Sequence, residues 1–174
     1  MREIEFKGKA SHSGEWVFGS LLKICGNFHI VSETDMYEDG HHIRQESDMP
    51  TWVDPETICQ FTGILDNNGN KIYEGDIVRY YCVDSRCINP DCDSFNWIYE
   101  PFLRKVEGAV YYEDCTFECE DYAPLSFCGI EKLDELRSDL NVTEEDGWAD
   151  ADGNIIDESK LGIYVIGNIH DQNT

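Results

Sequence analysis

The fold is decided by residues 60–81, which read QFTGILDNNGNKIYEGDIVRYY. Two runs that alternate between apolar and polar residues flank a polar segment, and this period of two is typical of β-strands. Asn68-Gly69 tolerates the positive φ angles of a type I′ turn, so we expect a hairpin that turns there. Gly75-Asp76 interrupts the second run and predicts a bulge or a corner between two strands.

Further strand patterns lie on both sides of this hairpin. They occupy residues 4–7, 15–22, 23–31, 106–112 and 162–169. The first two predict an N-terminal hairpin, and the last predicts a buried closing strand. Asp152-Gly153 is a second strong turn signal and predicts a hairpin turn of its own.

Between these strands the patterns change. Ile130, Leu133, Leu136 and Leu140 recur at near-helical spacing, which predicts one amphipathic helix within residues 129–140. Residues 32–54 are polar and predict a long loop, and residues 82–101 show no regular pattern. The sum is a mainly β, antiparallel fold, either a small barrel or a strongly bent sheet, with one or two short helices.

Length and composition are those of one folded domain. The chain has 174 residues, of which 41% are hydrophobic and 12% are aromatic. This is enough apolar material for one core and too little for two by default, so we expect a single domain over residues 1–174. Residues 82–159 form its less typical part, because they are acidic and rich in cysteine.

Charge is the most unusual property of the chain. Its 36 acidic and 13 basic residues give a net charge of −23. Residues 107–174 hold 18 of the acids and 3 of the bases. Such a field repels nucleic-acid phosphates, so direct nucleic-acid binding is disfavoured. The acidity indicates either a face that docks on a basic, nucleic-acid-binding protein or a solvated surface that maintains solubility.

Compartment and thiol chemistry follow from two further observations. No apolar run approaches the roughly 20 residues of a membrane span, and residues 1–5 lack the apolar stretch of a signal peptide, so we expect a cytoplasmic protein without membrane contact. In a reducing cytosol cysteines are thiols that pack as small apolar groups. The eight cysteines are at positions 25, 59, 82, 87, 92, 115, 119 and 128.

Three stretches together resemble the YopX family of bacteriophage and prophage proteins. They are REIEFKGK with GEWVFGSL at residues 2–9 and 14–21, PETICQFTG with NGNKIYEGDIV at residues 55–63 and 68–78, and VIGNIH at residues 165–170. The resemblance implies a phage or prophage origin, a mainly β fold and self-association into a homo-oligomer. It carries no catalytic residues, and residues 82–159 show no pattern of the family.

The cysteines offer the sharpest candidate for a metal site. Cys82, Cys87 and Cys92 are each separated by four residues, and Cys115 and Cys119 form another close pair. A four-thiolate zinc site can be drawn from them, but the spacing is at the loose edge of what such sites use. We therefore predict protein without stoichiometric zinc and assign no metal ligand.

Other catalytic patterns are equally weak. A nucleophilic cysteine needs a nearby base, and none of His12, His29, His41, His42 and His170 has a local thiol partner. Asp150, Asp152 and Asn154 occupy the first, third and fifth positions of a calcium loop, but Ile155 stands where that loop requires glycine. We interpret this segment as a hairpin turn and assign no catalytic or cofactor-binding residue.

Phe95, Trp97 and Tyr99 alternate, so a strand would project all three rings to one face, as core if buried and as an interface if exposed.

Our leading hypothesis is a non-enzymatic accessory protein that binds a host or phage protein through an acidic surface. The alternative is a small-molecule binder or enzyme with its site at a barrel mouth or subunit interface. A structural zinc module is third, and we expect no cofactor.

Overall fold

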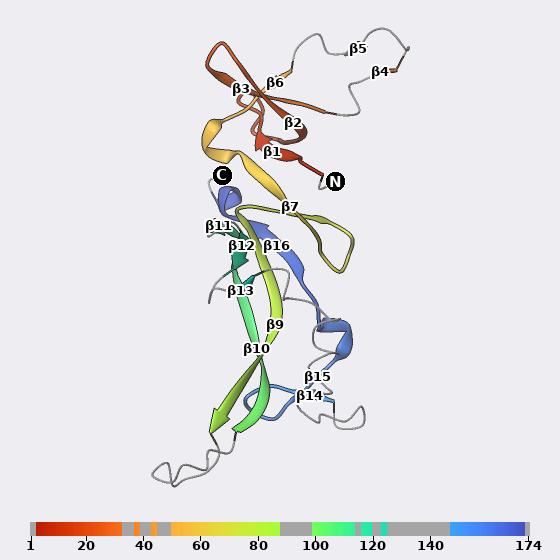
Figure 1. Ribbon diagram of the computed structural model, residues 1–174, viewed down its shortest axis with the longest axis vertical. Coiled ribbons are helices and arrows are strands. Elements are labelled where there is room, and N and C mark those ends of the chain that lie inside the picture. Colours follow the sequence, from red (N-terminus) through yellow and green to blue (C-terminus); the bar gives the residue numbers. More distant parts are fainter. Residues whose placement is uncertain are drawn as a thin grey trace.

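The computed structural model describes residues 3–32, 37–38, 43–44, 50–87, 99–113, 116–119, 123–124 and 147–172. In this part of the chain almost all regular structure is antiparallel strand, which confirms the predicted mainly β fold. The described strands form several sheets and no closed barrel. Figure 1 shows an elongated molecule, with one sheet at one end and a long two-stranded ribbon that reaches the other. No described helix has the length and apolar character needed to cross a bilayer.

The first sheet has six strands in the order β6-β3-β2-β1-β7-β8. They are β1 (Phe6–Lys9), β2 (Trp16–Ile24), β3 (Asn27–Val31), β6 (Thr51–Trp52), β7 (Cys59–Leu65) and β8 (Lys71–Tyr73). All neighbouring strands pair antiparallel, which confirms the N-terminal hairpin. β1 lies inside the sheet, with Lys7 opposite Phe18 of β2 and Cys59 of β7.

The second sheet continues directly from the first. It consists of β9 (Asp76–Cys87), β10 (Tyr99–Ala109) and β16 (Tyr164–Asn168), in the order β10-β9-β16. β9 and β10 form the long ribbon and stay in register from Ile77 opposite Ala109 to Cys87 opposite Tyr99. β16 pairs antiparallel with the start of β9, so the end of the chain returns to the junction of the two sheets.

Short elements complete the described structure. Two-stranded or three-stranded ladders are formed by β4 (Tyr37–Glu38) with β5 (Ile43–Arg44), by β11 (Tyr111–Glu113), β12 (Thr116–Cys119) and β13 (Ala123–Pro124), and by β14 (Trp148–Ala149) with β15 (Ile155–Ile156). The helical turns are η2 (Pro55–Thr57), η5 (Glu158–Lys160) and η6 (Ile169–Gln172). The amphipathic helix predicted within residues 129–140 lies outside the described residues.

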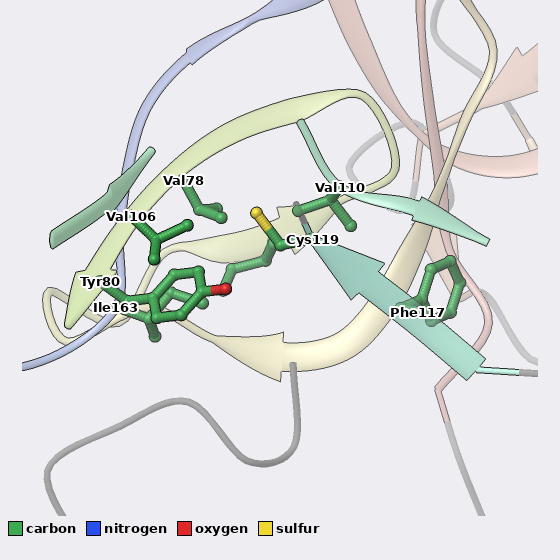
Figure 2. Close-up of a cluster of buried hydrophobic side chains, with 8 residues drawn as sticks. Val78, Tyr80, Val106, Val110, Phe117, Cys119 and Ile163 are labelled. Carbon is green, nitrogen blue, oxygen red and sulfur yellow. The ribbon is translucent and has the colours of Figure 1, made fainter. Parts of the chain in front are cut away.

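Apolar side chains cover both faces of the ribbon. On one face Tyr80 and Val106, which are opposite each other, belong to a core cluster that includes Cys119 and Ile163 (Figure 2). On the other face Val83 and Leu103 are opposite each other and pack with Trp148 and Leu161. Where these residues pack, the ribbon therefore lies at the centre of the hydrophobic core.

Strands extend into residues 82–101, where the sequence shows no regular pattern. β9 runs to Cys87 and β10 begins at Tyr99, and residues 88–98 lie outside the described residues. A strand that is half-buried on one face alternates between apolar and polar residues, whereas Cys82 and Val83 pack against opposite clusters. The alternation is absent at these two residues for this reason.

Two turns correct the prediction of turn type. The hairpin at Asn68-Gly69 is confirmed between β7 and β8, but within residues 66–70 only Gly69 has a positive φ, of 84°. Cys25 and Gly26, with φ of 50° and 91°, form the two-residue turn between β2 and β3. Positive φ at both central residues is the mark of a type I′ turn, so that turn type occurs at the tip of the β2–β3 hairpin, with cysteine at a position that favours asparagine or glycine.

The closing strand is shorter and less buried than predicted for residues 162–169. β16 ends at Asn168, and Ile169 begins η6. Ile166 and Ile169 are exposed, and β16 pairs with β9 on one side only, with a register shift between Val165 and Gly167.

Candidate functional site

Three segments that are far apart in the sequence meet where the first sheet passes into the second. Lys7 comes from β1, Asp76 begins β9, and Asn168 ends β16. The Lys7 ammonium and the Asn168 Nδ2 both donate to Asp76 Oδ1, the second bond measuring 2.8 Å. The Tyr73 backbone N–H donates to Asp76 Oδ2 at 2.8 Å. We call Lys7, Asp76 and Asn168 the polar junction; Figure 1 shows that β1, β7 and the C-terminal end lie close together at this level.

The polar junction is buried and internally satisfied. Asp76 is 1% exposed and Lys7 is 7% exposed. The Lys7 Nζ lies 4.8 Å from the ring centroids of both Trp16 and Tyr73, so two aromatic faces and one carboxylate surround its charge. Removing one partner of such a pair leaves a buried uncompensated charge, which costs about 3–5 kcal/mol. The junction therefore connects the two sheets and the end of the chain.

Gly75 makes the corner that places Asp76 in this position. Its φ is 78°, its N–H donates to Val110 O at 2.7 Å, and its carbonyl accepts from Ile169 N at 2.9 Å. A Cβ at this position would lie 3.3 Å from the Ile169 side chain. Glycine thus allows the chain to leave β8, turn, and start β9 with the aspartate directed inward. This confirms the predicted corner at Gly75-Asp76.

A second charged group lies beside the polar junction. The Glu5 carboxylate accepts from the Lys71 ammonium and from the Tyr73 hydroxyl, and Lys71 also donates to Glu3 at 2.7 Å. Burial raises the pKa of Glu5, but the hydrogen bonds from Lys71 and Tyr73 outweigh this effect and hold the pKa below its usual value. Hydrogen bonds to Glu3 and Glu5 raise the pKa of Lys71. Both groups are therefore charged at neutral pH.

A cleft of about 430 Å³ opens beside these residues. Glu5 and Lys71 line it together with the rings of Phe18 and Tyr73, whose centroids are 5.8 Å apart. Burial and then the hydrogen bond to Glu5 raise the pKa of Tyr73, so this phenol remains protonated. The cleft combines an aromatic wall with charged groups that are already paired with one another.

The C-terminal turn is fastened to the first sheet next to the junction. The Lys9 ammonium donates to His170 O at 2.6 Å, and the Trp16 Nε1 donates to Asp171 Oδ1 at 2.9 Å. The His170 backbone N–H donates to Asn168 Oδ1 at 2.9 Å. These bonds hold η6 against β1 and β2, so His170 is used in packing, with its ring 6.3 Å from that of Trp16.

The described cysteines differ in burial: Cys59 and Cys119 are buried, Cys82 is half-buried, and Cys25 is exposed at the turn between β2 and β3. Burial raises the pKa of Cys59 to about 11, which keeps its thiol protonated although Lys7 is near. Cys119 and Cys82 pack in or against the cluster of Figure 2. Cys92, Cys115 and Cys128 lie outside the described residues, and of Cys87 only the place at the end of β9 is described. Within the described part of the chain no three His, Cys, Asp or Glu side chains gather as a metal-binding set.

The other predicted candidates that the structure describes do not converge. His12 is exposed, and His29 lies opposite Trp52 on the first sheet. Phe95, Trp97, His41 and His42 lie outside the described residues. The segment that resembles a calcium loop is a hairpin turn, as predicted, because Asp150 Oδ1 accepts from the N–H groups of Asp152 at 3.0 Å and Asn154 at 2.9 Å. Hydrogen bonds from Asn154 hold the pKa of Asp150 below its usual value.

Sequence reasoning did not find the polar junction. Lys7 alternates with Phe6 and Gly8, so it falls on what looks like the solvent face of a strand. Its burial depends on β9 and β16, which cover that face. The available signal was Asp76 and Asn168, each a polar residue directly beside an apolar run, because buried polar groups are paired with one another.

The fold and the polar junction define a class: a small, mainly β protein whose first strand, central corner and last strand are joined by one buried ion pair. A family model described as YopX protein matches residues 5–174, which is nearly the whole chain. The chain belongs to the YopX family. The match confirms the resemblance and extends across residues 82–159, where the sequence shows no pattern of the family. No curated protein and no solved structure matches the chain.

Proposed function

We propose that this chain is a non-enzymatic accessory protein of a phage or prophage that binds a basic host or phage protein through the acidic surface of residues 107–174. Membership of the YopX family and the net charge of −23 support this reading. A partner that handles nucleic acid carries the basic surface that such a field attracts.

The observation that carries the proposal is the hairpin of β14 and β15. Trp148 and Leu161 are buried against Leu103 of the ribbon, so the base of this hairpin is anchored in the core. The hairpin presents Asp152 at its turn, Ile155 in β15 and Asp157 directly after β15 to solvent, and Ile155 is 66% exposed. An anchored surface with acidic groups around an exposed apolar residue suits recognition, because little conformational entropy is lost on binding.

A capture experiment tests this proposal. The tagged protein is mixed with bacterial lysate at about 50 mM and about 500 mM salt, because exposed charges are screened beyond roughly 8–10 Å near physiological ionic strength. We expect a basic protein to be captured at low salt and lost at high salt. The triple variant Glu144→Gln, Glu145→Gln, Asp146→Asn lies outside the described residues and is expected to reduce capture. We expect an unchanged melting temperature, because the sequence predicts these carboxylates at the surface, where each contributes under ~1 kcal/mol.

Recovery of no basic protein at low salt, or full capture by the triple variant, would mean that the acidity serves solubility alone. The control is Glu15→Gln with Glu56→Gln, which removes two exposed acids of the first sheet region, against three in the triple variant, and is expected to leave capture unchanged. A loss of capture by this control would show that total charge matters and the location of the acids does not.

A small-molecule binder or enzyme is the second candidate, and the cleft beside the polar junction favours it. Its volume of about 430 Å³ is within the range of ligand sites, about 300–1,000 Å³. However, Glu5 pairs with Lys71 and Lys7 pairs with Asp76, so the charged groups around the cleft are occupied in structural contacts. This arrangement favours the binding function over catalysis.

A further inference from the structure

The cleft beside the polar junction has one exposed aromatic wall. Phe18, on β2, is 46% exposed, although its ring is tilted against that of Tyr73 with centroids 5.8 Å apart. Tyr73 is buried and held by Glu5, so the ring of Phe18 rests on a fixed support. An exposed ring in a fixed position is a suitable surface for a cation or another planar group.

The charges around this wall favour a cation over an anion. Lys71 is bound by two carboxylates, Glu3 and Glu5, so this group carries one negative charge in excess. Lys7, which also lines the cleft, is neutralised by Asp76 and enclosed by two rings. An anion entering the cleft would approach Glu5 without meeting an uncompensated lysine, whereas a cation would find both a carboxylate and an aromatic face.

We propose that this cleft receives an arginine side chain of the basic partner, with its guanidinium stacked on Phe18 and directed toward Glu5. The inference rests on the function proposed above and names a contact for it. Arginine fits better than lysine because its guanidinium is planar and weakly hydrated, so it can stack on the ring of Phe18 while its charge faces Glu5, whose two oxygens already accept from Lys71 and Tyr73. The open form of the cleft suits a side chain that remains attached to a larger molecule, because free ligands are usually enclosed over most of their surface.

Two peptides of equal charge test this contact: acetyl-hexaarginine amide and acetyl-hexalysine amide, titrated at low salt against the full chain. We expect the arginine peptide to bind more tightly. Phe18→Leu is expected to weaken the arginine peptide about threefold to fivefold, which is the size of one exposed cation–π contact, and to change the lysine peptide less. Phe18→Tyr keeps a ring and is expected to retain the affinity.

The matched control is Trp52→Leu, which removes an exposed ring from β6 at the edge of the same sheet, outside the cleft and outside residues 107–174. It is expected to change neither affinity, and circular dichroism with melting curves confirms that each variant is folded. An unchanged arginine affinity in Phe18→Leu, or an equal loss in Trp52→Leu, would overturn the proposal.

The same titration separates this inference from the proposed function. If the Glu144, Glu145 and Asp146 amide variant weakens both peptides while Phe18→Leu weakens neither, the acidic surface binds cations and the cleft does not. If Phe18→Leu weakens the arginine peptide and the amide variant changes nothing, the cleft is a cation site and the acidic half is not the binding surface.

Discussion

Two hairpin turns of this protein have nearly the same sequence and the same hydrogen bonds but different surroundings. Residues 66–70 read DNNGN and residues 150–154 read DADGN. In both, the aspartate N–H donates to the asparagine carbonyl, at 2.7 and 3.0 Å, and the glycine N–H donates back to the aspartate carbonyl, at 2.9 and 3.0 Å. Gly69 and Gly153 have φ angles of 84° and 83°. The local geometry is therefore a property of the five residues themselves.

Tertiary contacts distinguish the two turns. In the first, Asn67 exchanges two hydrogen bonds with Ile163: its N–H donates at 2.9 Å, and its Oδ1 accepts at 2.7 Å. Asp66 Oδ2 accepts from Val165 N at 3.3 Å as well. In the second turn Ala151 stands in place of Asn67, and residues 151–154 are exposed. The first turn thus supports the fold, and the second is left at the surface, where we propose that it binds.

The largest expected difference concerns the aspartates. Asp66→Ala removes the acceptor for the N–H groups of Asn68 and Asn70 and for Val165 in a buried setting, and hydrogen bonds to a charged group contribute about 1.5–3 kcal/mol each. We expect it to lower the free energy of unfolding by about 3 kcal/mol. Asp150→Ala should cost clearly less. Urea unfolding of both variants, followed by tryptophan fluorescence, measures this difference. Equal losses of unfolding free energy would show that the contacts of the first turn with Ile163 and Val165 do not stabilise the protein.

The next largest effects are expected at three glycines: one that packs against the first turn, and one inside each turn. Gly162 has φ of 151°, and a Cβ there would lie 2.4 Å from Asn67 Oδ1, so Gly162→Ala should cost about 2–3 kcal/mol. Gly69→Ala and Gly153→Ala meet open space and should each cost about 1 kcal/mol, from positive φ alone. Thermal melts of the three variants provide the comparison. Unequal costs at Gly69 and Gly153 would contradict the claim that the two turns are locally the same.

A smaller effect is expected at the second position of each turn. Asn67→Ala gives the first turn the sequence of the second at this position and leaves the Ile163 N–H without its acceptor, which should cost about 1–2 kcal/mol. The reverse change, Ala151→Asn, lies at the surface and should be nearly neutral, within about 0.5 kcal/mol. Denaturant midpoints of the two variants test this asymmetry, and the prediction fails if the two changes have similar costs.

The smallest expected effect is on how the stability of the protein depends on pH. Burial raises the pKa of Asp66, but hydrogen bonds from Asn70 and from backbone N–H groups outweigh this effect and lower it. Because the pKa is lower in the folded than in the unfolded chain, this stabilisation is complete above the unfolded value of about 4 and is lost as the pH falls through the folded value. Between pH 5 and pH 3 Asp66→Asn should therefore lose less stability than the natural chain. If urea titrations show that both chains lose the same stability between pH 5 and pH 3, the assignment of this pH dependence to Asp66 is wrong.

The sequence predicted the parts of the fold that depend on neighbouring residues. Asn68-Gly69 and Asp152-Gly153 were sufficient for both hairpin turns, and Gly75-Asp76 for the corner, because turn residues act locally. The type I′ assignment was wrong because the Asp66 carboxylate accepts two backbone N–H groups and stabilises a different turn. That choice depends on a side-chain contact that dipeptide preferences do not contain.

The candidate site could not be predicted in the same way. The burial of Lys7 depends on Asp76 and Asn168, which are 69 and 161 residues away along the chain. No local pattern encodes such a pairing. The exposure of Phe18 was equally invisible, because an aromatic residue in a strand normally predicts core. Over half of the acids in residues 107–174 lie outside the described residues, so their surface stays a prediction from the sequence.

The central claim is that the acids of the second half act through their position and not through total charge. The double variant Asn68→Asp with Asp152→Asn tests it most directly, because it moves one charge from the second turn to the first while the net charge stays at −23. Each turn already accepts the other's residue at this position, so the fold should be unchanged. The measurement is the association rate at low salt with the basic protein recovered by capture. We predict a decrease of about twofold, since charges at an interface steer association; an unchanged rate in a folded double variant would contradict the account.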